Sequence, residues 1–244
     1  MDRDRINYLK KYIQRFQTGC NTYLSPLCDP SNKYVFVIGS GWGTEIFWAL
    51  SNGAKEVVGI DPSHRSTEPL DELIQENFRK KVHYKTYQGI LEEYIAYEKR
   101  RFDLILSHNV FEHIEDVLST LRAIPEILKD NGRLAIFTDP LFFSSVGSHL
   151  NIEPWEHLWG DLEAKKDAFA GYEWHQYQTL NHMTTSDFVG YLKGSKAIAL
   201  QFFLKPDRNL KKFQLYRERI AQKCDASILD LTTEGISAEI AWKM

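Results

Sequence analysis

Three glycines at alternate positions, Gly39, Gly41 and Gly43, follow the apolar run at residues 35–38 and precede a segment that begins at Thr44. Glycine lets the backbone adopt positive φ and lets a ligand approach closely. A buried strand that runs into a glycine-rich turn and then a helix forms a cofactor site in open α/β sheets, because the helix N-terminus offers unpaired N–H groups. This loop therefore predicts a nucleotide or nucleoside cofactor.

Two details favour a cofactor over a merely tight strand-to-helix turn. Asp61 ends the next apolar strand, 22 residues after Gly39, where a carboxylate can accept both hydroxyls of a ribose. The glycine spacing is GxGxG, and Thr44 stands where the dinucleotide-binding pattern GxGxxG has its third glycine. Since that glycine allows tight helix packing beside a pyrophosphate, its absence favours a nucleoside cofactor without a pyrophosphate.

The elements that must position these residues alternate between strand and helix, which predicts a mostly parallel sheet covered by helices on both faces. Apolar runs predict five strands before residue 140, and helices follow the first, second and fourth of them. The predicted strands are 34–38, 56–61, 82–87, 102–107 and 133–138, and the predicted helices are 44–50, 67–78 and 115–132, the last with a kink at Pro125.

The remaining segments are less regular. An amphipathic helix is expected at 4–18, and after residue 140 the periodicity fails until a capped helix at 184–193. A strand, a helix and a second strand follow at 197–204, 208–222 and 236–242, and 227–231 fits either a strand or a helical turn. We expect four parts: an N-terminal cap at 1–32, a cofactor-binding core at 33–140, a substrate-side lid at 141–183 and the rest of the sheet at 184–244.

Four motifs in order resemble those of the class I S-adenosylmethionine-dependent methyltransferases, in the branch with many small-molecule methyltransferases. VIGSGWG (37–43) is similar to the family's first motif, VVGIDPS (57–63) to its second-strand acidic motif, FDLILSHNVFEHIED (102–116) to its fourth-strand motif and LKDNGRLAIFT (128–138) to its approach to strand five. The resemblance covers roughly residues 33–140. It implies a Rossmann-like, doubly wound, mostly parallel seven-stranded sheet and S-adenosylmethionine as methyl donor.

The resemblance also implies where the cofactor lies. The glycine loop would pack against the methionine and ribose, the residues after strand three would border the adenine, and the end of strand four would line the sulfonium. Family members often carry an acidic residue near the methionine amino group where this chain has Val37, so another group meets the amine or binding is weaker. The implied cofactor residues are Gly39, Ser40, Gly41, Gly43, Asp61, Pro62, Gln88, Gly89, Ile90, Ser107, His108 and Asn109.

Methyl transfer from a sulfonium requires positioning of the two partners, and a base when the acceptor is an alcohol or phenol. The segment SSVGSHLNIEPWEHLWG (144–160) resembles one that follows strand five in some uncharacterised family members, so it should cover the substrate side of the pocket. His149 within it is the candidate general base, and the alternative is a histidine that only orders the loop. His113 is expected to be a packed, structural residue.

His149, Glu153 and His157 have an H-x3-E-x3-H spacing that could suggest metal. Pro154 opposes a continuous ligand-bearing helix there, and the family fold needs no metal, so no metal site is expected. His175 and His182 could also face the pocket. The many aromatic side chains of 142–174 are expected in the core or lid.

We therefore expect a methyltransferase that acts on an oxygen, in preference to a nitrogen, of a small-molecule or sugar-like acceptor. The alternatives are a catalytically inactive S-adenosylmethionine-binding regulatory protein and a nicotinamide-dependent oxidoreductase, which Thr44 disfavours. A net charge of −3 leaves no basic footprint of the kind that nucleic-acid binding requires. Without an apolar run of about 18 residues, and with a charged N-terminus, we expect a cytoplasmic protein without a membrane partner.

Overall fold

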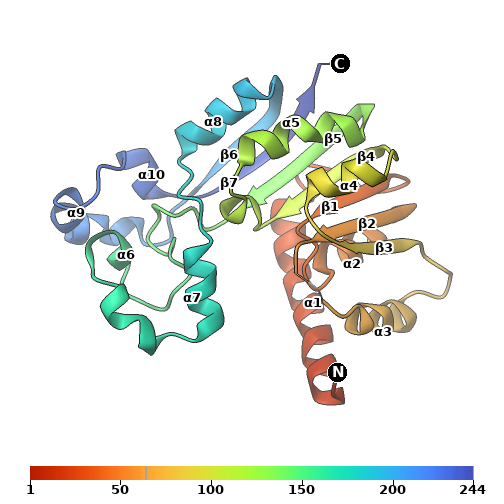
Figure 1. Cartoon of the computed structure of the whole chain (residues 1–244), viewed down its shortest axis with the longest axis horizontal. Helices are drawn as coiled ribbons and strands as arrows, with labels where there is room; N and C mark the ends of the chain where they lie inside the picture. Colours follow the sequence, from red (N-terminus) through yellow and green to blue (C-terminus); the bar gives the residue numbers. More distant parts are fainter. Residues whose placement is uncertain (64, 244) are drawn as a thin grey trace.

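A seven-stranded sheet with helices on both faces organises the computed structural model, which describes residues 1–63 and 65–243 (Figure 1). The strand order is β3-β2-β1-β4-β5-β7-β6. The first five strands pair in parallel, and β7 is antiparallel to both of its neighbours, β5 and β6. This arrangement confirms the predicted doubly wound, mostly parallel sheet.

The parallel part of the sheet follows the predicted alternation of strand and helix. Its strands are β1 (Tyr34–Ile38), β2 (Glu56–Asp61), β3 (Tyr84–Gln88), β4 (Phe102–His108) and β5 (Leu128–Thr138). Its helices are α1 (Arg3–Tyr23), α2 (Thr44–Ser51), α3 (Glu68–Asn77), α4 (Leu91–Tyr97) and α5 (Val117–Ile127), with a short 3-10 turn η1 (Phe111–His113) after β4.

The C-terminal half adds an antiparallel edge and a lobe of short helices. The edge consists of α8 (Thr185–Gly194), β6 (Ala197–Pro206) and β7 (Thr233–Trp242). The lobe contains α6 (Glu156–Trp159), η2 (Glu163–Ala168), α7 (Gly171–Gln178), η3 (Leu210–Lys212), α9 (Phe213–Ala221) and α10 (Ile228–Thr232). The undecided segment 227–231 is therefore helical. Among the described residues, no helix has the length and apolar content needed to cross a bilayer.

Several element boundaries differ from the sequence prediction. Helix α5 ends at Ile127 rather than near residue 132, because Leu128 already pairs with Phe102 in the sheet. Helix α1 extends past residue 18 to Tyr23, since the buried Cys20 continues its apolar stripe. The sequence prediction had no counterpart of α4, whose seven residues are too few to reveal a helical period.

Two apolar cores lie on opposite faces of the sheet. Side chains alternate across a strand, so each buried strand contributes to both cores. In β1, Val35 and Val37 face the core beneath α1, α2 and α3, whereas Phe36 and Ile38 face the core beneath α4, α5 and α8. Strands that are apolar throughout therefore agree with a sheet covered on both sides.

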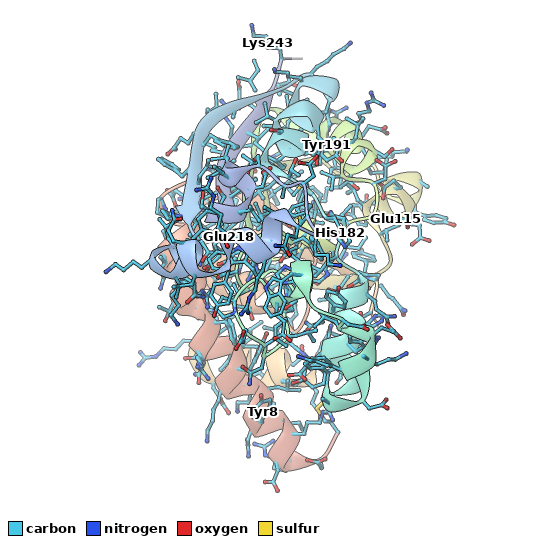
Figure 2. The ribbon with its side chains drawn as sticks, turned by 90° about the vertical axis from the view of Figure 1, so that its left-hand side faces the viewer. Tyr8, Glu115, His182, Tyr191, Glu218 and Lys243 are labelled. Atoms are coloured by element: carbon cyan, nitrogen blue, oxygen red, sulfur yellow. The ribbon has the colours of Figure 1, made fainter. Side chains whose placement is uncertain are left out.

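The lobe is built from two separate stretches of chain. Residues 141–183 and 207–232 share an apolar cluster around the fully buried Trp155. In Figure 2 the lobe faces the viewer, with Glu218 on α9 and His182 on the connection to α8, and Tyr8 marks the projecting end of α1. The segment predicted as a lid at 141–183 is thus held by helices that follow β6.

A charge network joins the entrance of the lobe to the sheet. Glu234 on β7, whose side chain is fully buried, pairs with Lys205 (2.6 Å) and Arg208 (2.5 Å). Lys205 also pairs with Asp139, directly after β5. Burial alone would raise the pKa of Glu234, but hydrogen bonds from Arg208 and Lys205 lower this pKa to about 2.

We expect Glu234→Gln to reduce the free energy of unfolding by about 3 kcal/mol at neutral pH, because it removes one partner of a buried ion pair. The pKa of Glu234 is depressed in the folded state, so its stabilisation is fully present above the ordinary value of 4.5 and is lost as the pH falls toward about 2. Urea unfolding at a series of pH values measures the difference in the free energy of unfolding between variant and wild type. A difference that stays constant on acidification contradicts the assignment. Glu218→Gln, on the exposed face of α9, should leave the free energy of unfolding unchanged.

Candidate functional site

The glycine loop connects β1 to α2, and its three glycines have positive φ: +72° at Gly39, +48° at Gly41 and +93° at Gly43. A Cβ at Gly43 would lie 2.5 Å from Cδ2 of Leu70, so this glycine permits α3 to pack against the loop. A Cβ at Gly41 would meet nothing within 4 Å. The backbone of Gly41 therefore stands open toward a ligand.

Three cavities surround this loop at the carboxyl edge of the parallel strands. The first, of about 520 Å³, has mixed polar walls that include Ser40, Gly41, Gly43, Asp61 and Gln88. The second, of about 590 Å³, has largely apolar walls that include Gly39, Pro62, Gly89, Ile90 and His113. The third, of about 160 Å³, lies under α1, and its walls include Gly39, Ser40, Glu45, His108 and Asn109.

All the implied cofactor residues except Ser107 thus line one of these cavities. Ser107 is fully buried within β4, and its hydroxyl donates to the Ile38 carbonyl (3.4 Å). It lies one residue before the end of the strand, too early to reach the edge. Its contribution is to tie β4 to β1.

The walls of these cavities fit an adenosyl group. Each carboxylate oxygen of Asp61 accepts one backbone N–H at 2.9 Å, Oδ2 from Gly41 and Oδ1 from Ser63. A carboxylate oxygen has two lone pairs, so Asp61 retains acceptors for ribose hydroxyls. The apolar side chains of Ile60 and Ile90 line the neighbouring cavity and offer a surface for a flat base.

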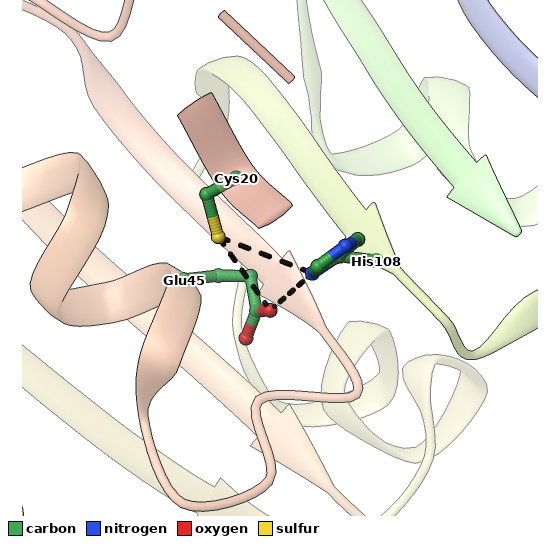
Figure 3. A group of neighbouring side chains, drawn as sticks. All are labelled: Cys20, Glu45 and His108. Carbon is green, nitrogen blue, oxygen red and sulfur yellow. Dashed lines mark hydrogen bonds and ion pairs between the residues drawn. The ribbon is translucent and has the colours of Figure 1, made fainter. Parts of the chain in front are cut away.

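A buried polar group under α1 was not indicated by the sequence. Glu45, in the first turn of α2, is only 6% exposed. Nδ1 of His108 donates to Oε1 of Glu45 (2.9 Å), and Sγ of Cys20 lies 4.0 Å from the same oxygen (Figure 3). An acidic residue in a first helical turn is common for electrostatic reasons alone, so the sequence contained no signal for this role.

The structure places His149 beside the short turn that follows β4. Its ring centroid lies 5.1 Å from that of His113, which lines the apolar cavity. Glu112, the neighbour of His113, is 2% exposed and accepts a hydrogen bond from Oγ1 of Thr138 (2.5 Å). One ligating atom from each of Glu112, His113 and His149 lies within 4.8 Å of the others.

Burial changes the protonation of this group. It lowers the pKa of His149 to about 4, and the charge of His113 adds to the effect. Burial also raises the pKa of Glu112 to about 8. At neutral pH the imidazole of His149 is therefore unprotonated, and its Nε2 is buried without a hydrogen-bond partner.

The spacing of His149, Glu153 and His157 does not bring these three residues together around one point. His157 belongs to the lobe, where its Nε2 donates to the Phe142 carbonyl (2.6 Å). His182 stacks on Phe142 with a centroid separation of 3.6 Å, and His175 is exposed on α7. Trp155 and Trp174 are buried in the lobe, and Tyr172 is 69% exposed.

Comparisons with known proteins agree with this geometry. A family model described as a methyltransferase domain matches residues 1–186, about three quarters of the chain. An uncharacterized protein of Haemophilus influenzae is 28% identical over 113 residues, which cover 46% of this chain and 44% of that protein. The chain thus matches less than half the length of this curated relative.

Two solved structures share the fold at low sequence identity. An S-adenosylmethionine-dependent methyltransferase of Mesorhizobium loti has a TM-score of 0.55 at 16% identity, over 90% of this chain and 95% of that one. Phosphoethanolamine N-methyltransferase 2 of Haemonchus contortus, in complex with S-adenosyl-L-methionine, has a TM-score of 0.57 at 17% identity, over 93% of this chain and 53% of that one. With the family match and the loop geometry, the chain belongs to the class I S-adenosylmethionine-dependent methyltransferases.

Proposed function

We propose that the chain transfers the methyl group of S-adenosylmethionine to an oxygen, in preference to a nitrogen, of a small-molecule or sugar-like acceptor. The observation that carries the preference for oxygen is the unprotonated, unpartnered Nε2 of His149 beside a cavity-lining histidine. An alcohol or phenol must lose a proton as it is methylated, whereas a neutral amine can attack first. A small acceptor also suits the net charge of −3 better than a nucleic acid does.

Bound S-adenosylmethionine would supply an electrophilic methyl group on a sulfonium that is its own leaving group. We assign the ribose hydroxyls to Asp61 and the adenine to the apolar wall around Pro62 and Ile90. His108 and Asn109, at the end of β4, would line the methionine side. The chain would then act mainly by holding the two reactants in line.

Glu45 is our candidate for the carboxylate that meets the methionine ammonium. Val37 stands where family members often have an acid, and its side chain is buried in the core beneath α2. Glu45 shares the small cavity under α1 with Gly39, and His108 holds its carboxylate from one side. The contacts from Nδ1 of His108 and Sγ of Cys20 both fall on Oε1, so Oε2 of Glu45 remains as an acceptor for an ammonium.

His149 would receive the acceptor's proton. Its pKa of about 4 keeps the ring unprotonated at neutral pH but makes it a weak proton acceptor. The deprotonation it assists must therefore be coupled to methyl transfer rather than precede it. His149 has a φ of 60°, a conformation that His and Asn tolerate better than most residues, so its position is held by the loop backbone.

For Asp61→Ala we expect S-adenosylmethionine affinity to fall by roughly 1.5–3 kcal/mol, the value of a hydrogen bond to a charged group. Isothermal titration calorimetry with S-adenosylhomocysteine measures the change. Asp167→Ala, at an exposed position of η2 that lines none of the three cavities, serves as the control. An affinity that Asp61→Ala leaves unchanged would refute the ribose assignment.

Glu45→Gln tests the ammonium assignment separately. It keeps the shape of the side chain but removes the charge, so S-adenosylhomocysteine should bind about tenfold more weakly. Decarboxylated or deaminated cofactor analogues sharpen the readout, because only an analogue without the amino group should bind wild type and variant equally. Equal losses for both analogues would show that Glu45 acts only on the structure of the loop.

His149→Asn should lower kcat by about 10²–10⁴-fold, the usual contribution of a general base, with little change in S-adenosylhomocysteine affinity. Asparagine tolerates the positive φ at this position, so the loop should keep its shape. Transfer of a labelled methyl group to a pool of phenols, alcohols and amines measures turnover, with His83→Ala as an exposed-histidine control. Near wild-type turnover in His149→Asn would refute the assignment of His149 as the base. Cofactor binding without transfer to any acceptor would indicate a binding protein instead of an enzyme.

A further inference from the structure

The side chains of Glu112, His113 and His149 lie close together, and two of them have a buried polar atom without a partner. Glu112 accepts from Thr138 through Oε2, while its Oε1 is buried without a partner. Nε2 of His149 is also buried without a partner. Buried polar atoms are nearly always paired, so two orphaned atoms within one small cluster need an explanation.

A hydrogen bond determines the tautomer of His113. The hydroxyl of Thr179 donates to the Gln176 carbonyl (2.9 Å), so it accepts from Nδ1 of His113 (2.9 Å). Nε2 of His113 therefore carries a lone pair. At His149 the backbone of Pro140 opposes the lowering of the pKa by burial, and Nε2 of this ring is buried without a partner.

This is the arrangement that metal-binding histidines use. A ligating imidazole usually donates its other ring N–H to a carbonyl, hydroxyl or carboxylate, which fixes the tautomer and the ring orientation. Two imidazole nitrogens and one carboxylate are a ligand set for divalent first-row transition ions. Asp139, whose Oδ1 is also buried without a partner, adds a second carboxylate near Glu112.

We propose that Glu112, His113 and His149 bind a divalent transition-metal ion of the zinc type at the edge of the apolar cavity. One ligating atom of each residue lies within 4.8 Å of the other two, so the three residues can reach one ion. An ion held by Oε1 of Glu112 and Nε2 of His149 would pair both orphaned atoms. Three protein ligands leave a position open, as in catalytic zinc sites. An acceptor oxygen bound there would be polarised by the ion, a step that rests on the proposed function. With Nε2 on the ion, His149 would hold the metal instead of taking the proton, which would pass to water.

Among the residues that the structure describes, Cys20, Glu45 and His108 form the other compact group of potential ligands, and this group differs from the proposed site in two respects. Glu45 and His108 already pair with each other at 2.9 Å. Within the described residues, none of the side-chain nitrogen or oxygen atoms of this group is buried without a partner. This group under α1 needs no ion to satisfy it.

The test is the binding of Zn²⁺ and Co²⁺ to the whole protein after removal of bound metal with a chelator. Calorimetry with Zn²⁺ should show one saturable site per chain, and Co²⁺ should produce a visible absorption band. Glu112→Gln and His149→Asn should each weaken Zn²⁺ binding by about 100-fold or more, since even a group that only orients a ligand contributes about 10–100-fold. Thr179→Val should cost about tenfold, because it removes only the acceptor that orients His113.

Cys20→Ser and His83→Ala, which leave the proposed ligands intact, should bind Zn²⁺ like wild type. Circular dichroism without metal shows whether each variant folds. If Glu112→Gln does not fold, the Zn²⁺ affinities of the peripheral variant Thr179→Val and the loop variant His149→Asn still test the proposal. Absence of a saturable site, or a site lost in Cys20→Ser but retained in His149→Asn, would overturn the proposal. Methyl transfer that depends on His149 in the metal-free protein would overturn the metal site and leave the proposed function intact. Saturable Zn²⁺ binding without methyl transfer to any acceptor would support the metal site and overturn the proposed function.

Discussion

Parallel pairing of β2, β1, β4 and β5 is the constraint on which the site depends. The register pairs Ile38 with Ile60 on one side and with Ser107 on the other, and Ser107 with Ile136. All four strands therefore end at one edge, and the loops that follow them meet there. Backbone hydrogen bonding, rather than any particular side chain, brings the glycine loop, Asp61 and the β4 turn together.

The turn after β4 also holds the lobe in place. Nδ2 of Asn181 donates to the carbonyls of Phe111 (2.6 Å) and Ile114 (2.7 Å), and its backbone N–H donates to that of Glu112 (2.9 Å). One side chain from the far end of the lobe thus satisfies the backbone of η1. The same turn presents Glu112 toward the loop that carries His149.

Helix α1 closes the other side of the site. Nε2 of Gln17 donates to the Thr44 carbonyl (3.0 Å), so α1 rests on the first turn of α2. Gly19 lets the helix approach His108, because a Cβ there would lie 3.1 Å from its Cε1. The cavity with Glu45 exists only because this N-terminal helix covers the loop.

The sequence alone determined the alternation of strands and helices, the glycine loop and Asp61, because these signals are local: apolar runs, turn residues and spacing. It also made His149 a candidate base, from its place after strand five, and that role stays a prediction. It did not indicate α4, which is too short to show a period, or the burial of Glu45 against His108, since an acidic residue is ordinary in a first helical turn. It predicted a structural role for His113, and nothing local showed that a loop 36 residues later returns to this residue. Only the tertiary structure decides which polar atoms are buried together and which lack a partner, since that depends on contacts between distant segments.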